Sequence, residues 1–385
     1  MDLPAQTSGE VIDQGIEALQ GLLGEAWEVS IEPQPPLPLH GDEGWDAVVR
    51  VLSRGDGIFT ELLVDVRDHL TPKGVTQLGS TAALVRRLNR NSALMVFSPW
   101  ISPKAQEELR RREIDFLDLT GNISLRISRP AVVIHTQGAV RAPASHRSAP
   151  SGKPLLTGPR AGRLIRLLAD VKPPYRATEL AEHSGLSLPY VSRLLDALED
   201  QLLIGREGRT VTSVHWQDLL RTRANHLDLM RQTNPQGLLA PNGVQQVLDQ
   251  LVDRQGVIAE GRVLVTGSYA ARPVAPVAVG GQLMLYVTPD KKHTRDVVQE
   301  LHLLPVPEAA DVLLLRAPDL GVLQRPRRYD RYFQVGLSQL VLDCLSGPGR
   351  MPAEGEKVLA FMEEERLWRT DSLSLLSRDE SHRLF

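Results

Sequence analysis

The feature that most constrains the fold of this 385-residue chain is a run of amphipathic segments within residues 158–215. The first segment, Arg160–Asp170, has apolar residues spaced for one face of a helix, namely Leu164, Ile165, Leu167 and Leu168. A turn with two prolines, Pro173 and Pro174, follows it. This run favours a fold of three short helices and a hairpin that pack around one apolar core.

The next two segments predict a helix, a tight turn and a second helix. Thr178–His183 is expected to be a short helix that ends at Gly185, because glycine readily adopts the left-handed conformation of a helix end. Ser187 is expected to cap the following helix, LPYVSRLLDALEDQ. The apolar residues of that helix recur at helical spacing and should face inward: Val191, Leu194, Leu195 and Leu198.

A β-hairpin is predicted directly after these helices. The stretch LLIGREGRTVTSVHW predicts an apolar strand, a turn rich in glycine and arginine, and a second β-rich strand.

The net charge of this part of the chain differs from that of the rest. Residues 141–232 hold 14 Lys and Arg against 9 Asp and Glu, a net +5, whereas the whole chain is −3 and the rest therefore −8. A basic middle between acidic flanks is typical of a central nucleic-acid-binding module.

This order of elements resembles the winged helix–turn–helix domains of bacterial transcription regulators. The phrase ELAEHSGLSLPYVSRLLDALEDQLLI is similar to the pattern of the IclR and MarR groups. The resemblance covers about 60 residues and implies that the third helix enters the major groove of duplex DNA while the hairpin wing contacts the backbone or minor groove. It implies DNA contacts from Ser187, Tyr190, Ser192, Arg193, Arg206 and Arg209, and the stripe on the first helix adds Arg160 and Arg163.

Several of these residues also have a purely structural interpretation. Tyr190 can be a partly buried ring packed on the second helix, and Arg206 and Arg209 can be solvated turn charges. Arg160, Arg163 and Arg166 recur every third residue along one side of the first helix. That stripe fits a phosphate-facing surface and a solvated face equally well.

The region before residue 140 reads as a mixed α/β domain. Helices are predicted over Glu10–Leu23, Thr76–Arg90 and Ser102–Arg112, with Ser102 as the cap of the third. Strands are predicted at Trp27–Ile31, Ala47–Leu52, Glu61–Val66, Ala93–Phe97, Asp115–Leu119, Ile123–Ser128 and Ala131–His135. The sequence RGDG between the second and third strands predicts a hairpin turn, and DLTGN predicts a strand-end turn with Gly121 at positive φ. A linker rich in Ala, Pro, Ser and Gly follows at residues 141–159.

This series of elements resembles the PD-(D/E)xK nuclease superfamily, including its Mrr-like restriction branch, and implies a restriction-endonuclease-like fold. Asp46 would open the second strand, and Asp65 and Arg67 would stand where the family has acid-x-Lys. In an active member the two carboxylates hold Mg²⁺ and the lysine helps to place the attacking hydroxide. Because Arg67 stays charged, it cannot act as that lysine; Lys73 is the nearest substitute. The alternative is an ordinary Asp65–Arg67 ion pair in a domain that does not cut DNA.

Residues 160–231 are therefore expected to form a winged helix–turn–helix domain, and residues 244–385 a further α/β domain. In the latter, strands are predicted at Arg262–Ser268, Leu283–Val287 and Asp311–Leu315, and helices at Thr294–Leu301, Gly336–Leu345 and Glu354–Glu365. The phrase VTGSYAA resembles the Gly–Ser opening of nucleotidyltransferase-like domains, but the next strand, GGQLMLYV, lacks their metal-binding carboxylates. The wider pattern is similar to the C-terminal part of AbiEi-type antitoxin regulators.

Composition excludes several other classes. The single cysteine, Cys344, rules out an intramolecular disulfide and a thiolate zinc site, and its apolar neighbours predict a buried thiol. No signal peptide or apolar run of membrane-spanning length is present, so a cytoplasmic protein is expected. Nothing resembles a P-loop, an H-E-x-x-H helix or a Rossmann fingerprint, so no cofactor or metal is expected.

Three hypotheses of function follow from these patterns. The first is a transcription regulator that binds double-stranded DNA as a homodimer, with a protein partner for its C-terminal domain. A helix over Gln217–Met230 would serve dimerisation or pack on its own chain. The second is a Mg²⁺-dependent DNA-cleaving defence nuclease that uses Asp46 and Asp65, and the third is a protein-interaction scaffold without DNA contact. An antitoxin-like regulator is a variant of the first.

Overall fold

The fold was analysed in a computed structural model, which describes residues 7–32, 45–88, 91–129, 131–141, 156, 158–253, 263–276, 280–329, 332–365 and 368–376. The chain forms two compact units: residues 1–152 with 200–202, and residues 153–199 with 203–385. Most of the expected linker, residues 142–155 and 157, lies outside the described residues.

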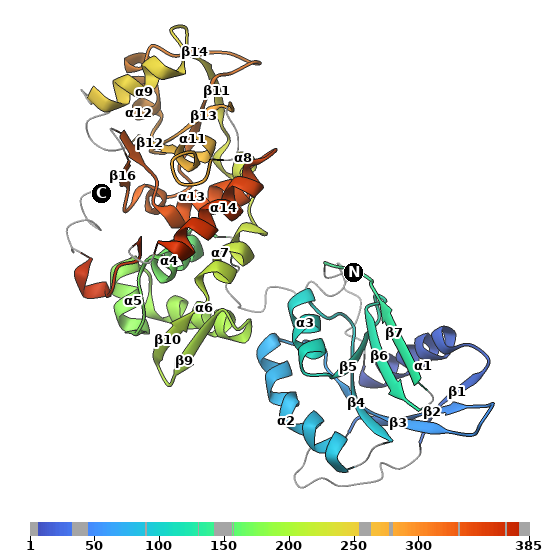
Figure 1. The fold of residues 1–385 in the computed structure, drawn as a ribbon. Helices are drawn as coiled ribbons and strands as arrows, with labels where there is room; N and C mark the ends of the chain where they lie inside the picture. The colour runs from blue at the N-terminus through green and yellow to red at the C-terminus, as the bar shows by residue number, and fades with distance from the viewer. Residues whose placement is uncertain are drawn as a thin grey trace. The chain divides into compact units, whose positions relative to one another are not determined.

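The first unit is built on one seven-stranded mixed sheet whose strands lie in chain order (Figure 1). Strands β1 to β3 are antiparallel, β3 to β5 are parallel, and β5 to β7 are antiparallel. The expected hairpin connects β2 and β3. The elements are α1 (Ser8–Leu23), β1 (Trp27–Ile31), β2 (Ala47–Ser53), β3 (Phe59–Val66), α2 (Pro72–Leu88), β4 (Ser92–Ser98), α3 (Pro103–Arg111), β5 (Asp115–Asp118), β6 (Ile123–Ser128) and β7 (Ala131–Thr136).

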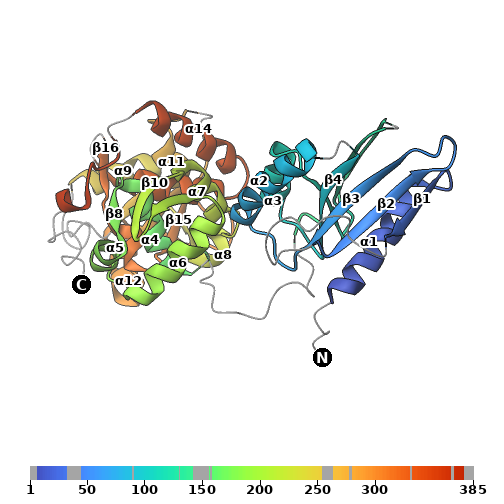
Figure 2. The same ribbon diagram turned by 90° about the horizontal axis from the view of Figure 1, so that it is seen from below.

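Helices cover both faces of this sheet, as Figure 2 shows. The alternation of side chains along a strand sends Met95 and Phe97 of β4 to the face covered by α1, where they join Val11 and Leu19 in one core. Leu94 and Val96 point to the opposite face and pack with residues of α2 and α3. Strand β4 is buried at every position except Ala93, which agrees with its nearly continuous apolar sequence.

Local signals fix the ends of several elements in this unit. The Ser102 side chain accepts a hydrogen bond from the Ala105 N–H at 3.3 Å, which confirms it as the cap of α3. The turn after β5 is organised by the buried carboxylate of Asp118. It accepts hydrogen bonds from the backbone N–H groups of Ile101, Thr120 and Asn122. Gly121 has φ +98°, as the DLTGN sequence predicts.

The second unit begins with three helices and a small sheet that has the order β8-β10-β9. Gly185 ends α5 at φ +63°, as expected. The Ser187 carbonyl accepts hydrogen bonds from the N–H groups of Tyr190 and Val191, which begins α6. The elements are α4 (Pro159–Asp170), β8 (Tyr175–Arg176), α5 (Ala177–Ser184), α6 (Leu188–Asp200), β9 (Ile204–Glu207), β10 (Thr210–Val214), α7 (Trp216–Ala224) and α8 (Leu229–Thr233).

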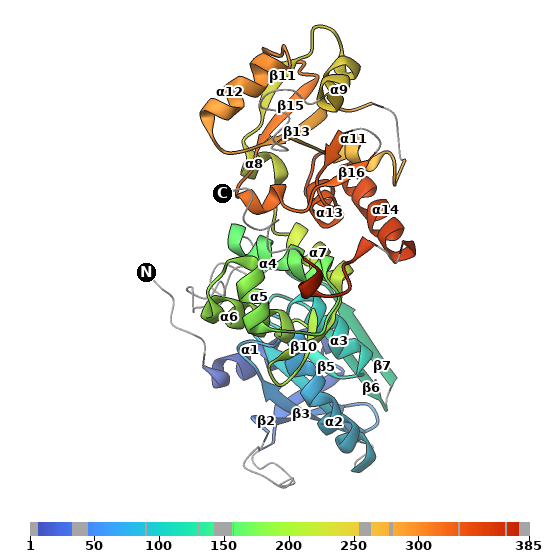
Figure 3. The ribbon, with the colours of Figure 1, turned by 90° about the vertical axis from the view of Figure 1, so that its left-hand side faces the viewer.

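A second seven-stranded mixed sheet follows in the same unit, with the order β14-β11-β15-β13-β12-β17-β16. Figure 3 shows α9 and α12 beside its β11, β15 and β13 strands. The stretch 232–243, which lies between the two domains expected at 160–231 and 244–385, contributes β11, which pairs antiparallel with β15. The elements are β11 (Gln236–Leu239), α9 (Val244–Asp253), β12 (Leu264–Thr266), α11 (Gly267–Ala271), β13 (Leu283–Val287), α12 (Lys291–Glu300), β14 (Leu304–Pro305), β15 (Val312–Arg316), η2 (Leu320–Leu323), β16 (Arg327–Tyr329), β17 (Tyr332–Gln334), α13 (Leu337–Leu345), α14 (Met351–Glu364) and η4 (Leu373–Leu375).

The three helices and the second sheet share one continuous hydrophobic core. Helix α7 packs against both α4 and α13, with Leu219 and Leu220 fully buried. The single helix expected over Gln217–Met230 is instead two helices, α7 and α8, and α7 packs on its own chain. The end of the described chain also returns to α4. The N–H of Thr370 donates to the Asp170 carbonyl, and Trp368 meets Trp216 edge to face at a centroid distance of 5.0 Å.

Candidate nucleic-acid interface

Helix α6 has one fully buried face and one accessible face. Val191, Leu194, Leu195 and Leu198 are at most 1% exposed, as the helical spacing predicts. On the other side, Ser187 and Arg193 are exposed, whereas Ser192 and Tyr190 are half-buried. The polar residues near the start of α6 therefore lie at the surface of the three-helix region, where a helix–turn–helix contacts a major groove.

Tyr190 lies between cations on neighbouring elements. Its ring packs against the core, and burial raises the pKa of its phenol. The positive charges of Arg160 on α4, Arg223 on α7 and Arg193 on α6 oppose that shift. Tyr190 is therefore partly accessible, as a DNA contact requires, and partly buried, as the alternative of a packed ring predicts.

The hairpin β9–β10 is the predicted wing, and its two arginines differ. Gly208 turns the chain at φ +59°, and the next residue, Arg209, is exposed. Arg206 is half-buried and pairs with Asp196 and Glu199 of α6; its distance to the Asp196 carboxylate is 2.7 Å. Arg206 therefore fastens the wing to α6, while Arg209 extends from the tip of the turn.

The arginine stripe on α4 is divided between surface and interior. Arg160 is exposed, but Arg163 donates to the Ser184 carbonyl at 3.1 Å, and its side chain is only 22% exposed. Arg166 is 5% exposed, with its Nη2 3.7 Å from Asp319 Oδ1. A solvated or phosphate-facing position for Arg166 was therefore wrong, because that part of the stripe faces η2 of the second sheet region.

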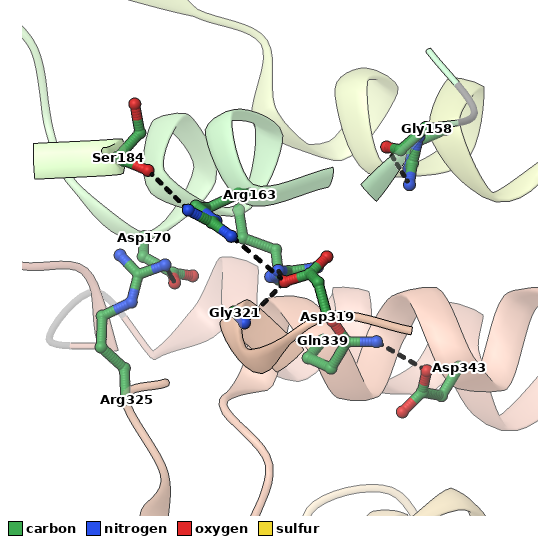
Figure 4. A network of polar contacts seen from close by, with 11 residues as sticks. Gly158, Arg163, Asp170, Ser184, Asp319, Gly321, Arg325, Gln339 and Asp343 are labelled. Carbon is green, nitrogen blue, oxygen red and sulfur yellow. Dashed lines mark hydrogen bonds and ion pairs between the residues drawn. The ribbon is translucent and has the colours of Figure 1, made fainter. Parts of the chain in front are cut away.

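Asp319 joins α4 to the loop that begins η2 (Figure 4). Its Oδ1 accepts a hydrogen bond from the Gly321 N–H at 2.6 Å and lies 4.0 Å from Arg163 Nη2. A second link is the ion pair between Arg325 and Asp170, at 2.9 Å. These contacts hold the helix–turn–helix region to the second sheet region by partly buried charges.

Arg223 of α7 is a buried cation that the sequence patterns did not single out. Its side chain is 5% exposed, and its Nη2 donates to the Gly158 carbonyl at 3.2 Å. Burial, followed by the charge of Arg166, lowers the pKa of Arg223 to about 10. In the sequence it stands among three arginines within 221–231, so only the packing of α7 distinguishes it.

In the first unit, Asp65 lies in β3, whereas Asp46 directly precedes β2 and Arg67 directly follows β3. Asp46 is exposed and accepts a hydrogen bond from the Val66 N–H at 2.7 Å. Asp65, 8% exposed near the end of β3, meets Arg67 through both carboxylate oxygens, at 2.8 and 2.9 Å. The ion pair is thus present in bidentate form. Lys73 lies in the first turn of α2.

The Gly–Ser turn after β12 is closed by buried carboxylates of α13 and α14. Thr266 donates to Asp343 at 2.6 Å, and Ser268 donates to Glu354 at 2.6 Å. The following strand, β13, is buried along its whole length and carries no carboxylate. Cys344 is also buried, as expected, and burial raises the pKa of its thiol.

Two absences hold for the described part of the chain. Within it, no group of three or more His, Cys, Asp or Glu side chains is arranged to hold a metal ion. None of the helices described is both long enough and apolar enough to span a bilayer.

A comparison with known families decides the nature of the three-helix region. Residues 159–207, from the start of α4 to the end of β9, match the family model described as the IclR helix-turn-helix domain. Residues 159–207 are an IclR-type helix–turn–helix domain. The IclR-type domain suggests DNA binding, which is typical of transcription regulators. No curated protein and no solved structure matches the chain. The protein is thus a mixed α/β protein with a central helix–turn–helix region and a mixed sheet on either side.

Proposed function

We propose that this protein is a transcription regulator that reads duplex DNA through α6 of its IclR-type domain. The observation that carries the proposal is the accessible face of α6, where Ser187, Ser192 and Arg193 lie beside Tyr190 and Arg160. Arg193 and the two serines are suited to base edges or phosphates, and Arg160 to the flanking backbone. Arg209 at the tip of the wing would meet the backbone or the minor groove.

Arg163 and Arg206 have supporting roles in this proposal. Both were expected to contact DNA, but their guanidinium groups are engaged by Ser184 and Asp319, and by Asp196 and Glu199. They would orient α4 and the wing from behind the contact surface. DNA recognition by two copies on neighbouring half-sites remains part of the proposal, since one helix reads only a few base pairs.

The experiment is a fluorescence-anisotropy titration of the full chain with fragmented genomic DNA at several salt concentrations. We expect the logarithm of the association constant to fall linearly with the logarithm of the salt concentration, because phosphate contacts release counterions. Absence of binding at the lowest salt would refute the proposal. Light scattering of the complex tests the two-copy arrangement, and a one-to-one complex on the preferred site would contradict it.

We also propose that the first unit is a restriction-endonuclease-like domain without nuclease activity. Two features support this likeness. Strand β3 pairs antiparallel with β2 and parallel with β4, and Asp46, directly before β2, lies next to the end of β3, where Asp65 stands. The bidentate pair with Arg67 occupies both oxygens of Asp65, and a guanidinium cannot exchange a proton during water activation. The alternative nuclease function is tested by incubating supercoiled and methylated DNA with protein and Mg²⁺ or Mn²⁺. Cleavage that Asp65→Ala abolishes would establish the nuclease instead.

The second sheet region is proposed to be a degenerate nucleotidyltransferase-like domain of the kind found in AbiEi-type antitoxin regulators. Support comes from the turn after β12, whose Gly–Ser sequence is retained while β13 offers no carboxylate for a metal. In this proposal the region contacts a protein partner. Recovery of a single partner that binds the purified chain in equal amounts would support it, and a chain that binds none would contradict it.

A further inference from the structure

Strand β7 forms one edge of the sheet in the first unit. It pairs with β6 and is the last strand in the order of that sheet (Figure 1). Its register with β6 runs without a shift from Ala131 to Thr136, so β7 has no bulge. No other described strand pairs with it. The backbone N–H and C=O groups on its outer side therefore form a regular row with which a further strand can pair.

Strand β7 lacks the features that normally keep an edge strand from pairing with another chain. Natural sheets protect their edges with charged residues, proline, bulges or very short strands. Among the described strands, each other edge carries a charged residue or a proline: Glu28 in β1, Arg176 in β8, Arg206 in β9, Pro305 in β14 and Arg327 in β16. Strand β7, with the sequence AVVIHT, has neither and is six residues long. It is the least protected edge of the described sheets.

The side chains of β7 leave apolar surface on both faces of the sheet. On one face Val133 is 68% exposed, the largest exposed fraction among the large apolar residues described. On the other face Val132 and Ile134 are half-buried and pack against the core beneath α1. Helices α1, α2 and α3 pack mainly on β1, β3, β4 and β5, so β7 lies beyond them. A strand added next to β7 would cover apolar side chains on both faces in addition to pairing the backbone.

The sequence of β7 is complementary to itself in an antiparallel arrangement. If two copies pair about a two-fold axis at Val133, this residue lies opposite Val133 of the second copy. Val132 then lies opposite Ile134, and Ala131 lies opposite His135. Apolar residues thus meet apolar residues on the core side, and the two histidines do not face each other.

The charges next to this edge also suit a second copy. Arg126 of β6 is the neighbour of Val133 across the strand pair. Its guanidinium pairs with Asp115 at 3.3 Å, so its charge is balanced within its own copy. Because β7 contains no Asp, Glu, Lys or Arg, the pairing places no such like charges opposite each other. A strand of another protein would have to supply this match, whereas a second copy already has it.

We propose that two copies of this protein associate through β7, in antiparallel register centred on Val133, so that their first-unit sheets become one continuous sheet. The remaining edges of that sheet are the two β1 strands, which carry Glu28. The association therefore stops at two copies and needs no DNA. It rests on the proposed function only in its consequence: the two IclR-type domains needed for neighbouring half-sites are joined before DNA is bound.

The test is sedimentation velocity of the full chain without DNA, at concentrations up to about 100 µM, since a single pair of strands is a small interface. The wild type is expected to form a dimer. Val133→Lys places two ammonium groups opposite each other and should weaken dimerisation at least about 10-fold. Ile31→Lys is the matched control, because Ile31 is 48% exposed on β1, the opposite edge of the same sheet. This variant should dimerise as the wild type does.

A charge-reversal pair separates loss of the interface from loss of the fold. Val133→Glu should weaken dimerisation for the same reason as Val133→Lys. A mixture of the two variants should form a heterodimer, because opposite charges then face each other across the two-fold axis. One variant is labelled uniformly with a heavy nitrogen isotope, so that native mass spectrometry distinguishes the heterodimer from either homodimer.

A wild type that remains monomeric at the highest concentration would overturn the proposal and leave β7 to a strand of another protein. A Val133→Lys variant that dimerises normally would also overturn it, since the dimer contact would then lie on another surface. Absence of the heterodimer from the mixture would overturn the register centred on Val133 and with it the proposal. DNA binding is measured separately: a dimer that binds no DNA would refute the proposed function alone, and a monomer that binds DNA would refute the β7 pairing alone.

Discussion

The arginines of the IclR-type domain fall into two groups according to what their guanidinium groups contact. Arg160, Arg193 and Arg209 are exposed. Arg163, Arg166 and Arg206 are turned toward carboxylates or carbonyls of the same chain. Phosphate contacts need accessible cations, so the exposed group should carry the electrostatic part of DNA affinity while the other group maintains the geometry.

Arg193 should contribute directly to DNA affinity. Arg193→Ala is expected to cost about 1–3 kcal/mol of binding free energy, the range for a good contact to a base. Arg295→Ala is the matched control, because Arg295 is an exposed arginine on α12. Anisotropy titrations of both variants on one DNA site provide the measurement. Equal affinities for the two variants would show that α6 does not carry the recognition.

Asp343 should make stability depend on pH in a defined direction. Its pKa is about 6 in the folded protein, against an ordinary value of 3.8, because burial outweighs the hydrogen bonds from Thr266, Gln339 and Tyr286 and the nearby charge of Arg166. Between these values the folded protein binds more protons than the unfolded one, so the contribution of this group falls as pH rises from about 4 to about 6.

The measurement is denaturant unfolding of the wild type and of Asp343→Asn across this pH range. The wild-type free energy of unfolding minus that of the variant should fall by roughly 3 kcal/mol from low to neutral pH, since one pKa unit corresponds to about 1.4 kcal/mol. A difference that is flat, or that rises with pH, would contradict the assignment.

At the scale of elements, apolar spacing predicts most of this fold because it reports which face of a segment is buried. The strands at Trp27–Ile31 and Leu283–Val287 have the predicted bounds, and α6 buries the predicted residues. Strand β11 was missed, since its sequence, QGLL, is short and lies between turn-forming residues. The spacing of the α4 arginines shows that they share a face, but it cannot show what that face meets. Asp319, which meets it, is about 150 residues away in sequence.

The wing should add affinity without sequence preference. Arg209 is exposed at the tip of the β9–β10 turn, where a cation can reach phosphate but is not held against base edges. Arg209→Ala should weaken binding about equally on all sequences and reduce the slope of log affinity against log salt by about 1. A salt titration on one preferred and one unrelated DNA measures both effects. An unchanged slope would remove the wing from the interface.

At the scale of the whole molecule, the IclR-type domain and the second sheet region lie in one compact unit. One core runs through both, and residues 368–376 return from the second region to α4. Arg369 donates to the carbonyls of Leu168 and Val171 at the end of α4, and Thr370 forms a bridge with Val171. These long-range contacts have no local sequence signal, which explains why two separate domains were expected.

This return segment should stabilise the DNA-binding region. Trp368→Ala removes the ring that packs on Trp216 and is expected to lower the free energy of unfolding by about 1–3 kcal/mol. Leu375→Ala is the control from the same segment, because Leu375 is 66% exposed, and it should change stability by less than about 0.5 kcal/mol. The free energies of unfolding of the two variants are compared by denaturant titration. Unfolding is followed by far-UV circular dichroism, which reports on the backbone rather than on the tryptophan that one variant lacks. Equal stabilities would show that the segment does not hold the two regions together.

The most direct test of DNA reading by α6 is selection of bound fragments from sheared genomic DNA, carried out in parallel with the wild type and Arg193→Ala. If α6 reads base edges, wild-type fragments should share a short motif, and the variant should lose preference at one position of it while still binding DNA. Fragments without a shared motif, or an identical motif from both proteins, would contradict sequence recognition by this helix.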